Sequence, residues 1–254
     1  MGSVYSSGRA KRDPKSDSGR KPGSKDRKKA ASASNKGKKS RKESILVLCA
    51  HSDDQVFGLG GTLAKFAEEG KRIIVVIFSY GEKSHPWLKR KVTVKMRVHE
   101  SHEAAKIIGI DKTIFLGIQE GRFQQEISDK NIHNRINSMI KKYRPKRIFT
   151  HAGDDPMPDH AAMNRFVLEL CDEIKYDGDV YTFDVWTPLK IKERNMPKLY
   201  IDITDTFRKK IKALKAFESQ WASMIALLWS VYWRAIRNGF KAHCRFAEVF
   251  QKIR

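Results

Sequence analysis

Residues 44–55 read Ser-Ile-Leu-Val-Leu-Cys-Ala-His-Ser-Asp-Asp-Gln. The run from Ser44 to Ala50 is short, continuous and apolar, which is typical of a strand that is buried on both faces. It ends in the polar cluster His51 to Gln55, and glycines then lead into a predicted helix from Leu59 to Glu69, which Gly70 ends. A buried strand followed by a turn and a helix is the building unit of an α/β sheet.

The same alternation continues through the rest of the chain. Further strands are predicted at Arg72–Ser79, Lys112–Leu116, Arg147–His151, Asp179–Trp186 and Leu199–Ile203. Helices are predicted at Val92–Ile108, Ile127–Tyr143, His160–Ile174, Phe207–Ala222 and from there to about Arg237. This pattern predicts an α/β fold with a Rossmann-like, doubly wound, mostly parallel sheet and helices on both faces. Ligands of such sheets bind beyond the carboxyl ends of the strands.

Two polar clusters lie at those carboxyl ends. The first contains His51 and Asp54, which are three residues apart across a turn, and the second runs from His151 to His160. Imidazole and carboxylate are ligands that zinc accepts, so the spacing favours a three-residue site of His51, Asp54 and His160 with an open fourth position. Asp53 lies beside this set as a general base. The alternative is an Asp-rich turn that caps the following helix.

Several spaced motifs resemble one known family. The stretches that carry the resemblance are Ala50–Gln55 with Gly58–Gly61, Arg97-x-x-Glu100, Leu116–Gly121, Asp155–His160, Lys210–Gln220 and Ala247–Phe250. They are similar to the signatures of the PIG-L / LmbE-like zinc-dependent N-deacetylases. The resemblance runs from about residue 44 to the C-terminus. It implies a Rossmann-like sheet and the removal of an N-acetyl group from an N-acetylglucosamine-type amino sugar or its conjugate.

The resemblance also implies a role for individual residues. His51, Asp54 and His160 match the ligands of one zinc ion per chain, although another divalent metal would suit the same ligands. Asp53 matches the general base, and Asp159 matches a carboxylate that orients a neighbouring group. Three further positions match residues that contact the substrate, namely Arg97, Glu120 and Met157.

Four positions depart from the family pattern: Ser52, Gln55, Met157 and Phe217. Met157 stands where the family has a histidine that stabilises the oxyanion or acts as a general acid, and a thioether can do neither. Losing one such group costs roughly 100- to 1,000-fold in rate. The alternative to an enzyme is therefore a metal-binding but catalytically weakened member that acts as a binding protein.

Charge divides the chain into two parts. The net charge is +22 over 254 residues, and residues 1–42 carry 15 Lys and Arg against 3 Asp, compared with 36 basic and 26 acidic side chains in residues 43–254. We predict a disordered basic tail at 1–42 and a deacetylase domain at 43–254. The tail is either a solubilising segment or a non-specific contact for a polyanion such as nucleic acid, the ribosome or an anionic membrane.

The remaining expectations concern compartment and assembly. The isolated cysteines Cys49, Cys171 and Cys244 indicate a reducing compartment, and no apolar run approaches the roughly twenty residues of a transmembrane segment, so we expect a soluble cytoplasmic protein. The aromatic residues from Trp221 to Trp233 recur near helical spacing, which favours a core or subunit interface over a sugar-stacking platform. Because related enzymes include soluble oligomers, a homo-oligomer is expected.

Overall fold

The chain is organised around one seven-stranded sheet in the order β3-β2-β1-β4-β5-β7-β6. The computed structural model describes residues 42–84, 87–129, 131–186 and 195–254. Its strands are β1 (Ser44–Cys49), β2 (Arg72–Ile77), β3 (Lys112–Phe115), β4 (Arg147–His151), β5 (Asp179–Phe183), β6 (Lys198–Asp202) and β7 (Ala247–Lys252). The predicted basic tail lies outside the described residues, apart from Lys42.

Five strands, β1 to β5, pair in parallel, and the chain winds outward from β1 in both directions. It first runs from β1 to β2 and β3 and then returns to place β4 on the other side of β1. The strand order therefore reverses between β1 and β4, and a doubly wound sheet binds its ligands in the crevice at that point. The Rossmann-like, mostly parallel fold is confirmed.

The sequence expectation omits β7 altogether. This strand inserts between β5 and β6 and pairs with both in antiparallel fashion. Its sequence, Ala-Glu-Val-Phe-Gln-Lys, places Glu248 within an otherwise strand-like pattern. The buried position of Glu248, 5% exposed, depends on partners that are distant in sequence, which the local pattern does not report.

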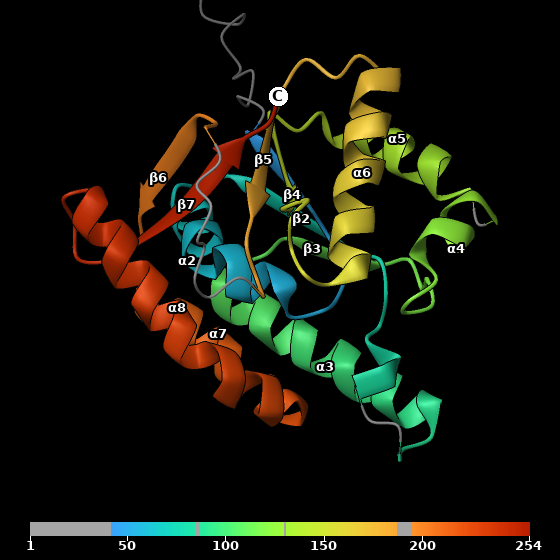
Figure 1. Ribbon diagram of the computed structural model, residues 1–254, viewed down its shortest axis with the longest axis horizontal. Coiled ribbons are helices and arrows are strands. Elements are labelled where there is room, and N and C mark those ends of the chain that lie inside the picture. Colours follow the sequence, from blue (N-terminus) through green and yellow to red (C-terminus); the bar gives the residue numbers. More distant parts are fainter. Residues whose placement is uncertain (1–41, 85–86, 130, 187–194) are drawn as a thin grey trace, which may run out of the picture. The chain divides into compact units, whose positions relative to one another are not determined.

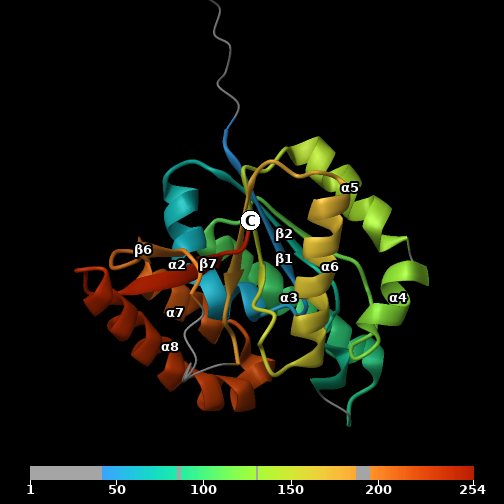
Figure 2. The same ribbon diagram turned by 45° about the horizontal axis from the view of Figure 1, so that its top comes forward.

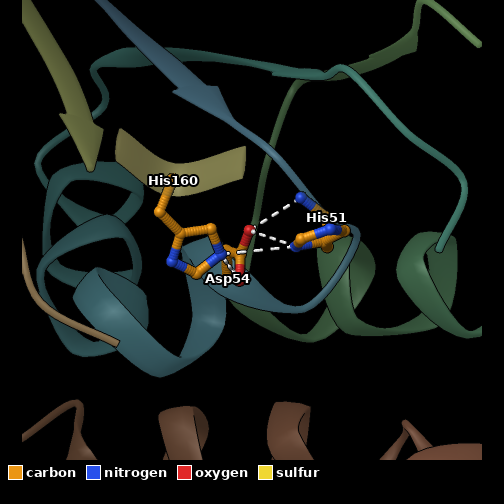
Figure 3. A group of neighbouring side chains, drawn as sticks. All are labelled: His51, Asp54 and His160. Atoms are coloured by element: carbon orange, nitrogen blue, oxygen red, sulfur yellow. Dashed lines mark hydrogen bonds and ion pairs between the residues drawn. The ribbon is translucent and has the colours of Figure 1, made fainter. Parts of the chain in front are cut away.

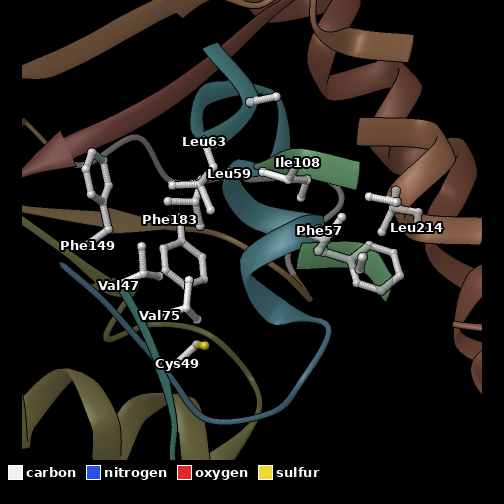
Figure 4. Packing of buried hydrophobic residues seen from close by; sticks show 14 of the residues in the cluster. Val47, Cys49, Phe57, Leu59, Leu63, Val75, Ile108, Phe149, Phe183 and Leu214 are labelled. Carbon is white, nitrogen blue, oxygen red and sulfur yellow. The ribbon is translucent and has the colours of Figure 1, made fainter. Parts of the chain in front are cut away.

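Helices cover both faces of the sheet (Figures 1 and 2). Alternate residues of β1 feed two separate cores: Ile45 and Val47 belong to one, and Leu46 and Leu48 to the other. Figure 4 shows part of the first core, where Val47 of β1 and Val75 of β2 lie near Phe183 and the inner side of α2 (Asp54–Glu68). This burial on both faces explains why the parallel strands read as continuous apolar runs.

The remaining helices mostly follow the predicted ranges. They are α3 (Arg90–Ile108), α4 (Phe123–Asp129), α5 (Ile132–Tyr143), α6 (Pro158–Glu173), α7 (Phe207–Lys215) and α8 (Trp221–Lys241), with short 3-10 turns η1 (Glu82–Ser84) and η2 (Glu218–Gln220). The helix predicted at 127–143 is instead two helices, because Asn131 adopts a left-handed conformation with φ of 51° before α5. Phe217, with ψ of 62°, likewise separates α7 from η2 and α8.

Helix α2 begins at Asp54 instead of at Leu59, and it is kinked where the glycines lie. Leu59 has non-helical dihedral angles, with φ of −143°. The glycines permit close packing: a Cβ on Gly58 would lie 2.2 Å from Cδ2 of Phe183, and one on Gly61 would lie 2.6 Å from Cδ1 of Ile203. The glycines thus let α2 lie directly against the sheet, which holds the turn before it in place.

No helix among the described residues is long and apolar enough to cross a membrane.

Candidate metal centre

The two polar clusters meet at the point where the strand order reverses. His51 and Asp54 follow β1 directly, and His160 lies in the first turn of α6, which follows β4. All three are buried, with exposed fractions of 7%, 2% and 0%. Figure 3 shows the two imidazoles on either side of the Asp54 carboxylate. The topology therefore brings together the three residues that the sequence predicts as metal ligands.

The ligand atoms lie at separations that suit a zinc ion. Nδ1 of His51 is 3.3 Å from Nε2 of His160. The Asp54 carboxylate places Oδ2 3.4 Å from Nδ1 of His51 and Oδ1 3.4 Å from Nε2 of His160. Zinc–ligand bonds of about 2.0–2.2 Å set tetrahedral neighbours roughly 3.3–3.6 Å apart. The donor types and their spacing both fit a divalent metal ion bound by all three residues.

His160 is held from behind by Asp155 and His151. Oδ1 of Asp155 lies 3.0 Å from Nδ1 of His160 and also accepts the backbone N–H of Met157. The ring of His151 stacks on that of His160 with 3.8 Å between centroids, and its Nε2 accepts the N–H of Ala50 at 3.0 Å. These contacts turn Nε2 of His160 toward Asp54. Nε2 of His151 also lies 3.2 Å from Oδ2 of Asp54, so His151, the last residue of β4, packs directly against the candidate metal centre.

His51 faces two carboxylates with its second nitrogen. Its Nε2 lies 3.6 Å from Oδ2 of Asp159 and 3.8 Å from Oε1 of Glu120. The backbone N–H groups of Gly121 and Lys83 bond to Asp159 and Glu120 respectively. Asp159 and Glu120 therefore lie beside the metal-ligand set, and a carboxylate on the outer nitrogen of a ligating histidine fixes the ring orientation.

The three histidines of the cluster differ in pKa, because burial and the neighbouring charges act on each of them differently. Burial lowers the pKa of His51, but the contacts with Asp159 and Asp54 outweigh it and raise that pKa to about 10. For His160 burial is likewise outweighed, by Asp54 and Asp155, and its pKa rises to about 9. Burial and the nearby His160 lower the pKa of His151 to about 4, so His151 is neutral. The two predicted ligands thus sit where positive charge is favoured, which suits a bound cation.

Asp53 lies next to the ligands and is paired with a buried arginine. Its Oδ1 is 3.3 Å from Nη2 of Arg97, whose side chain is 2% exposed and packs against the Phe217 ring at 5.9 Å. Among the described residues, Nε and Nη1 of Arg97 have no hydrogen-bond partner. A buried guanidinium with spare donors is costly unless something accepts from it, so this corner of the site suits a bound oxygen atom.

Three of the residues that depart from the family pattern, Gln55, Met157 and Phe217, have different surroundings in the structure. The Gln55 amide donates to the carbonyl of Ser52 at 2.8 Å, so it holds the turn after β1 together. Met157 is half-buried and precedes α6 as its N-cap residue. Phe217 is 1% exposed and lies in the core beside Arg97.

The chain is similar in sequence to several known proteins. The family profile described as "PIG-L: GlcNAc-PI de-N-acetylase" matches residues 46–171. The 4-oxalmesaconate hydratase of Pseudomonas putida is 28% identical, over 79% of this chain and 81% of its own length. The probable N-acetyl-alpha-D-glucosaminyl L-malate deacetylase 2 of Bacillus cereus is 24% identical, over 71% of this chain and 85% of its own length.

A solved structure shows the same fold. The N,N'-diacetylchitobiose deacetylase of Pyrococcus horikoshii superposes with a TM-score of 0.69 at 21% identity, covering 83% of this chain and 84% of that one. The chain belongs to the PIG-L / LmbE-like family, as its motifs indicate. Its relatives include deacetylases and a hydratase, so the relationship favours an enzyme.

Sequence reasoning assigned no role to Asp155, although the residue lies within a quoted motif. Its side chain is buried, 5% exposed, and its Oδ2 accepts backbone N–H groups of Val185 and Trp186 after β5. The available signal was a carboxylate five residues before a predicted ligand. Its contact with His160 depends on how α6 folds back over β4, so spacing alone did not reveal it.

Proposed function

We propose that this protein is a metal-dependent hydrolase that removes the N-acetyl group from an N-acetylglucosamine-type amino sugar or conjugate. The observation that carries the proposal is the buried set of His51, Asp54 and His160, with Asp53, the residue before Asp54, paired with a buried arginine. Family membership supports the reaction class, because its relatives include deacetylases of amino sugars.

The residues of the site divide the work of amide hydrolysis. His51, Asp54 and His160 would hold a zinc ion, which would supply Lewis-acid chemistry to the acetyl carbonyl and to the attacking water. Asp53 accepts the proton of the attacking water and returns it to the departing amine. Arg97 pairs with Asp53 and fixes the position of its carboxylate, and the spare N–H groups of Arg97 donate to an oxygen of the substrate.

The first test replaces the general base. Asp53→Asn keeps the size of the side chain and removes its basicity, so we expect acetate release to fall by about 100- to 10,000-fold with zinc content unchanged. Acetate is measured with zinc-loaded protein on N-acetylglucosamine, diacetylchitobiose and an N-acetylglucosaminyl conjugate. Lys95→Asn, a substitution on α3, serves as the matched control. If the wild type releases no more acetate than the Asp53 variant, the proposed catalysis is wrong.

The second test addresses Met157, the departure that favours a weakened binding protein. Met157→His restores an imidazole at the start of α6, and we expect acetate release to rise roughly 100-fold, because one group that stabilises the oxyanion is worth about that much. Met157→Leu is the control for side-chain size and should behave as the wild type. If neither variant nor wild type turns over but all bind zinc and an amino sugar, the binding-protein alternative holds instead.

A hydratase is the second candidate, because the relative from Pseudomonas putida that shares 28% identity acts on an unsaturated acid. Addition of water to a carbon–carbon double bond would use the same carboxylate to take the water proton. Loss of ultraviolet absorbance from an unsaturated dicarboxylate, without acetate release from any amide, would favour this reaction over deacetylation.

A further inference from the structure

The outer face of α8 carries an unusual amount of exposed apolar surface. Of the eleven exposed large apolar side chains among the described residues, seven lie on this one helix. Six of them recur every three or four residues and so share one side of the helix: Trp221, Ile225, Trp229, Trp233, Ile236 and Phe240. We call these six the α8 face. It extends over roughly 28 Å, and its exposed fractions run from 48% at Trp233 to 85% at Phe240.

The opposite side of α8 already forms part of the core, so the face is surplus to folding. Leu227, Val231 and Ala235 are 2–3% exposed and belong to the core cluster on this side of the sheet. Both ribbon views show α8 on the outside of the molecule (Figures 1 and 2). Large contiguous apolar patches on a protein surface mark binding sites, because leaving them in water is unfavourable.

None of the six residues of the α8 face is charged, and α8 carries few charged residues elsewhere. Trp221 to Lys241 contains no acidic residue. The guanidinium of Arg234 turns back to the carbonyls of Asp184 and Ser230, with Nη1 2.8 Å from the former. The face itself is therefore apolar and aromatic along its whole length.

Basic side chains border the face. Residues 207–246 contain nine Lys and Arg and one acid, Glu218, so they hold most of the positive excess of the folded domain. On α7, which lies beside α8 and contacts it through Phe207 and Tyr232, every exposed side chain is basic: Arg208, Lys209, Lys212 and Lys215. Lys241, the last residue of α8, and Arg245, which follows the helix, are also exposed.

We propose that the α8 face docks on the surface of a lipid bilayer that carries anionic headgroups. An apolar side rich in tryptophan with a basic border is the pattern of helices that lie in the membrane interface. The positive border complements anionic lipid, with each basic residue near the surface contributing to attraction. A second copy of the chain is a poorer occupant, because a two-fold contact would bring the same positive borders together.

Binding to vesicles tests this proposal independently of catalysis. The full chain is mixed with vesicles of phosphatidylcholine alone or of phosphatidylcholine with phosphatidylglycerol, and the bound fraction and the tryptophan emission are measured. We expect binding to the anionic vesicles with a blue shift of the emission, since the three tryptophans of the face enter the interface.

Two double variants separate the parts of the surface. Trp229→Ser with Phe240→Ser should weaken binding by about tenfold or more and reduce the blue shift, because two exposed apolar anchors are lost. Lys212→Ser with Lys215→Ser should weaken binding and make it less sensitive to salt. Trp87→Ser removes a tryptophan that is 74% exposed, more than any tryptophan of the α8 face, from the loop before α3, and it should leave binding unchanged. Circular dichroism and thermal unfolding check that each variant remains folded.

Three results would overturn the proposal. Vesicle binding that is unchanged in the Trp229 and Phe240 variant would place the interaction elsewhere, such as in the basic residues 1–42, which all variants retain. A wild-type oligomer that dissociates in this variant, measured by sedimentation velocity, would assign the face to a second copy. Binding of this face to single-stranded RNA but not to anionic vesicles would assign it to nucleic acid.

Discussion

The orientation of the His160 ring depends on a neighbouring carboxylate, that of Asp155. Asp155 holds its Nδ1 at 3.0 Å, and the same carboxylate accepts backbone N–H groups from the segment after β5. Because a neutral imidazole binds metal through one nitrogen, a carboxylate on the other nitrogen selects the tautomer and the ring orientation. Asp155 is therefore a positioning residue that links α6, β4 and β5 at the candidate metal centre.

Replacing Asp155 tests this role at the scale of one side chain. Asp155→Asn keeps the size but loses the charge, and we expect zinc affinity to fall about 10- to 100-fold, as is usual for outer partners of metal ligands. Competition with a zinc chelator gives the dissociation constant. Asp154→Asn, at an exposed neighbouring position in the same loop, is the matched control. Equal zinc affinity in the Asp155 variant and the wild type would contradict the assignment.

At the scale of one element, the kink in α2 is stabilised by a buried ion pair. Where Leu59 interrupts the helix, the N–H groups of Gly61 and Thr62 donate to Glu248 at 3.1 and 2.7 Å. The carbonyl of Phe57 accepts from Nζ of Lys210, which also pairs with Glu248 at 2.6 Å. The backbone groups that the kink releases are thus bonded again, and α2 can carry Asp54 at its first turn.

Breaking this pair should destabilise the fold strongly. Glu248→Ala leaves the Lys210 ammonium buried without its counter-charge and the two N–H groups of α2 unbonded, so we expect a loss of about 3–5 kcal/mol in the free energy of unfolding. Urea unfolding measures it. Glu68→Ala, which removes the partner of Lys209 in an exposed pair, should cost far less. A small effect of Glu248→Ala would mean that water or another group replaces the carboxylate.

At the scale of the whole molecule, the candidate metal centre lies where both halves of the sheet meet. His51 and Asp54 come from the β1 side, and His160 comes from the β4 side, with three carboxylates and a third histidine packed around them. A cation that binds the folded chain alone stabilises it by mass action. We therefore expect the stability of the domain to depend on metal at the switch point of the sheet.

Metal removal checks this coupling. Zinc at a thousand times its dissociation constant should add about 4 kcal/mol to the free energy of unfolding, which corresponds to a rise in Tm of about 10 °C for a domain of this size. Calorimetry of zinc-loaded and chelator-treated protein measures the difference. His160→Ala lacks one ligand and should show a much smaller shift on adding zinc. An equal shift in both proteins would place the stabilising metal at another site.

Much of this molecule could be predicted from its amino-acid sequence. The apolar runs such as Ser44–Cys49 are continuous because parallel strands are buried on both faces, and this pattern determines the doubly wound sheet. The polar clusters at the ends of β1 and β4 reveal the candidate ligands, since carboxyl ends of adjacent parallel strands share one edge. The apolar runs and the polar clusters are both local features of the sequence, so they can be recognised without knowing the tertiary contacts.

Other features were decided by tertiary structure alone. The strand β7 between β5 and β6, the bonds from Glu248 to α2 and the contact of Asp155 with His160 all join residues that no local period relates. The aromatic side of α8 illustrates the same limit: helical spacing predicted that Trp229 and Trp233 share a face, but the tertiary structure leaves that face exposed on the single chain. Periodicity determines which residues share a side, whereas the packing of distant segments decides what, if anything, covers it.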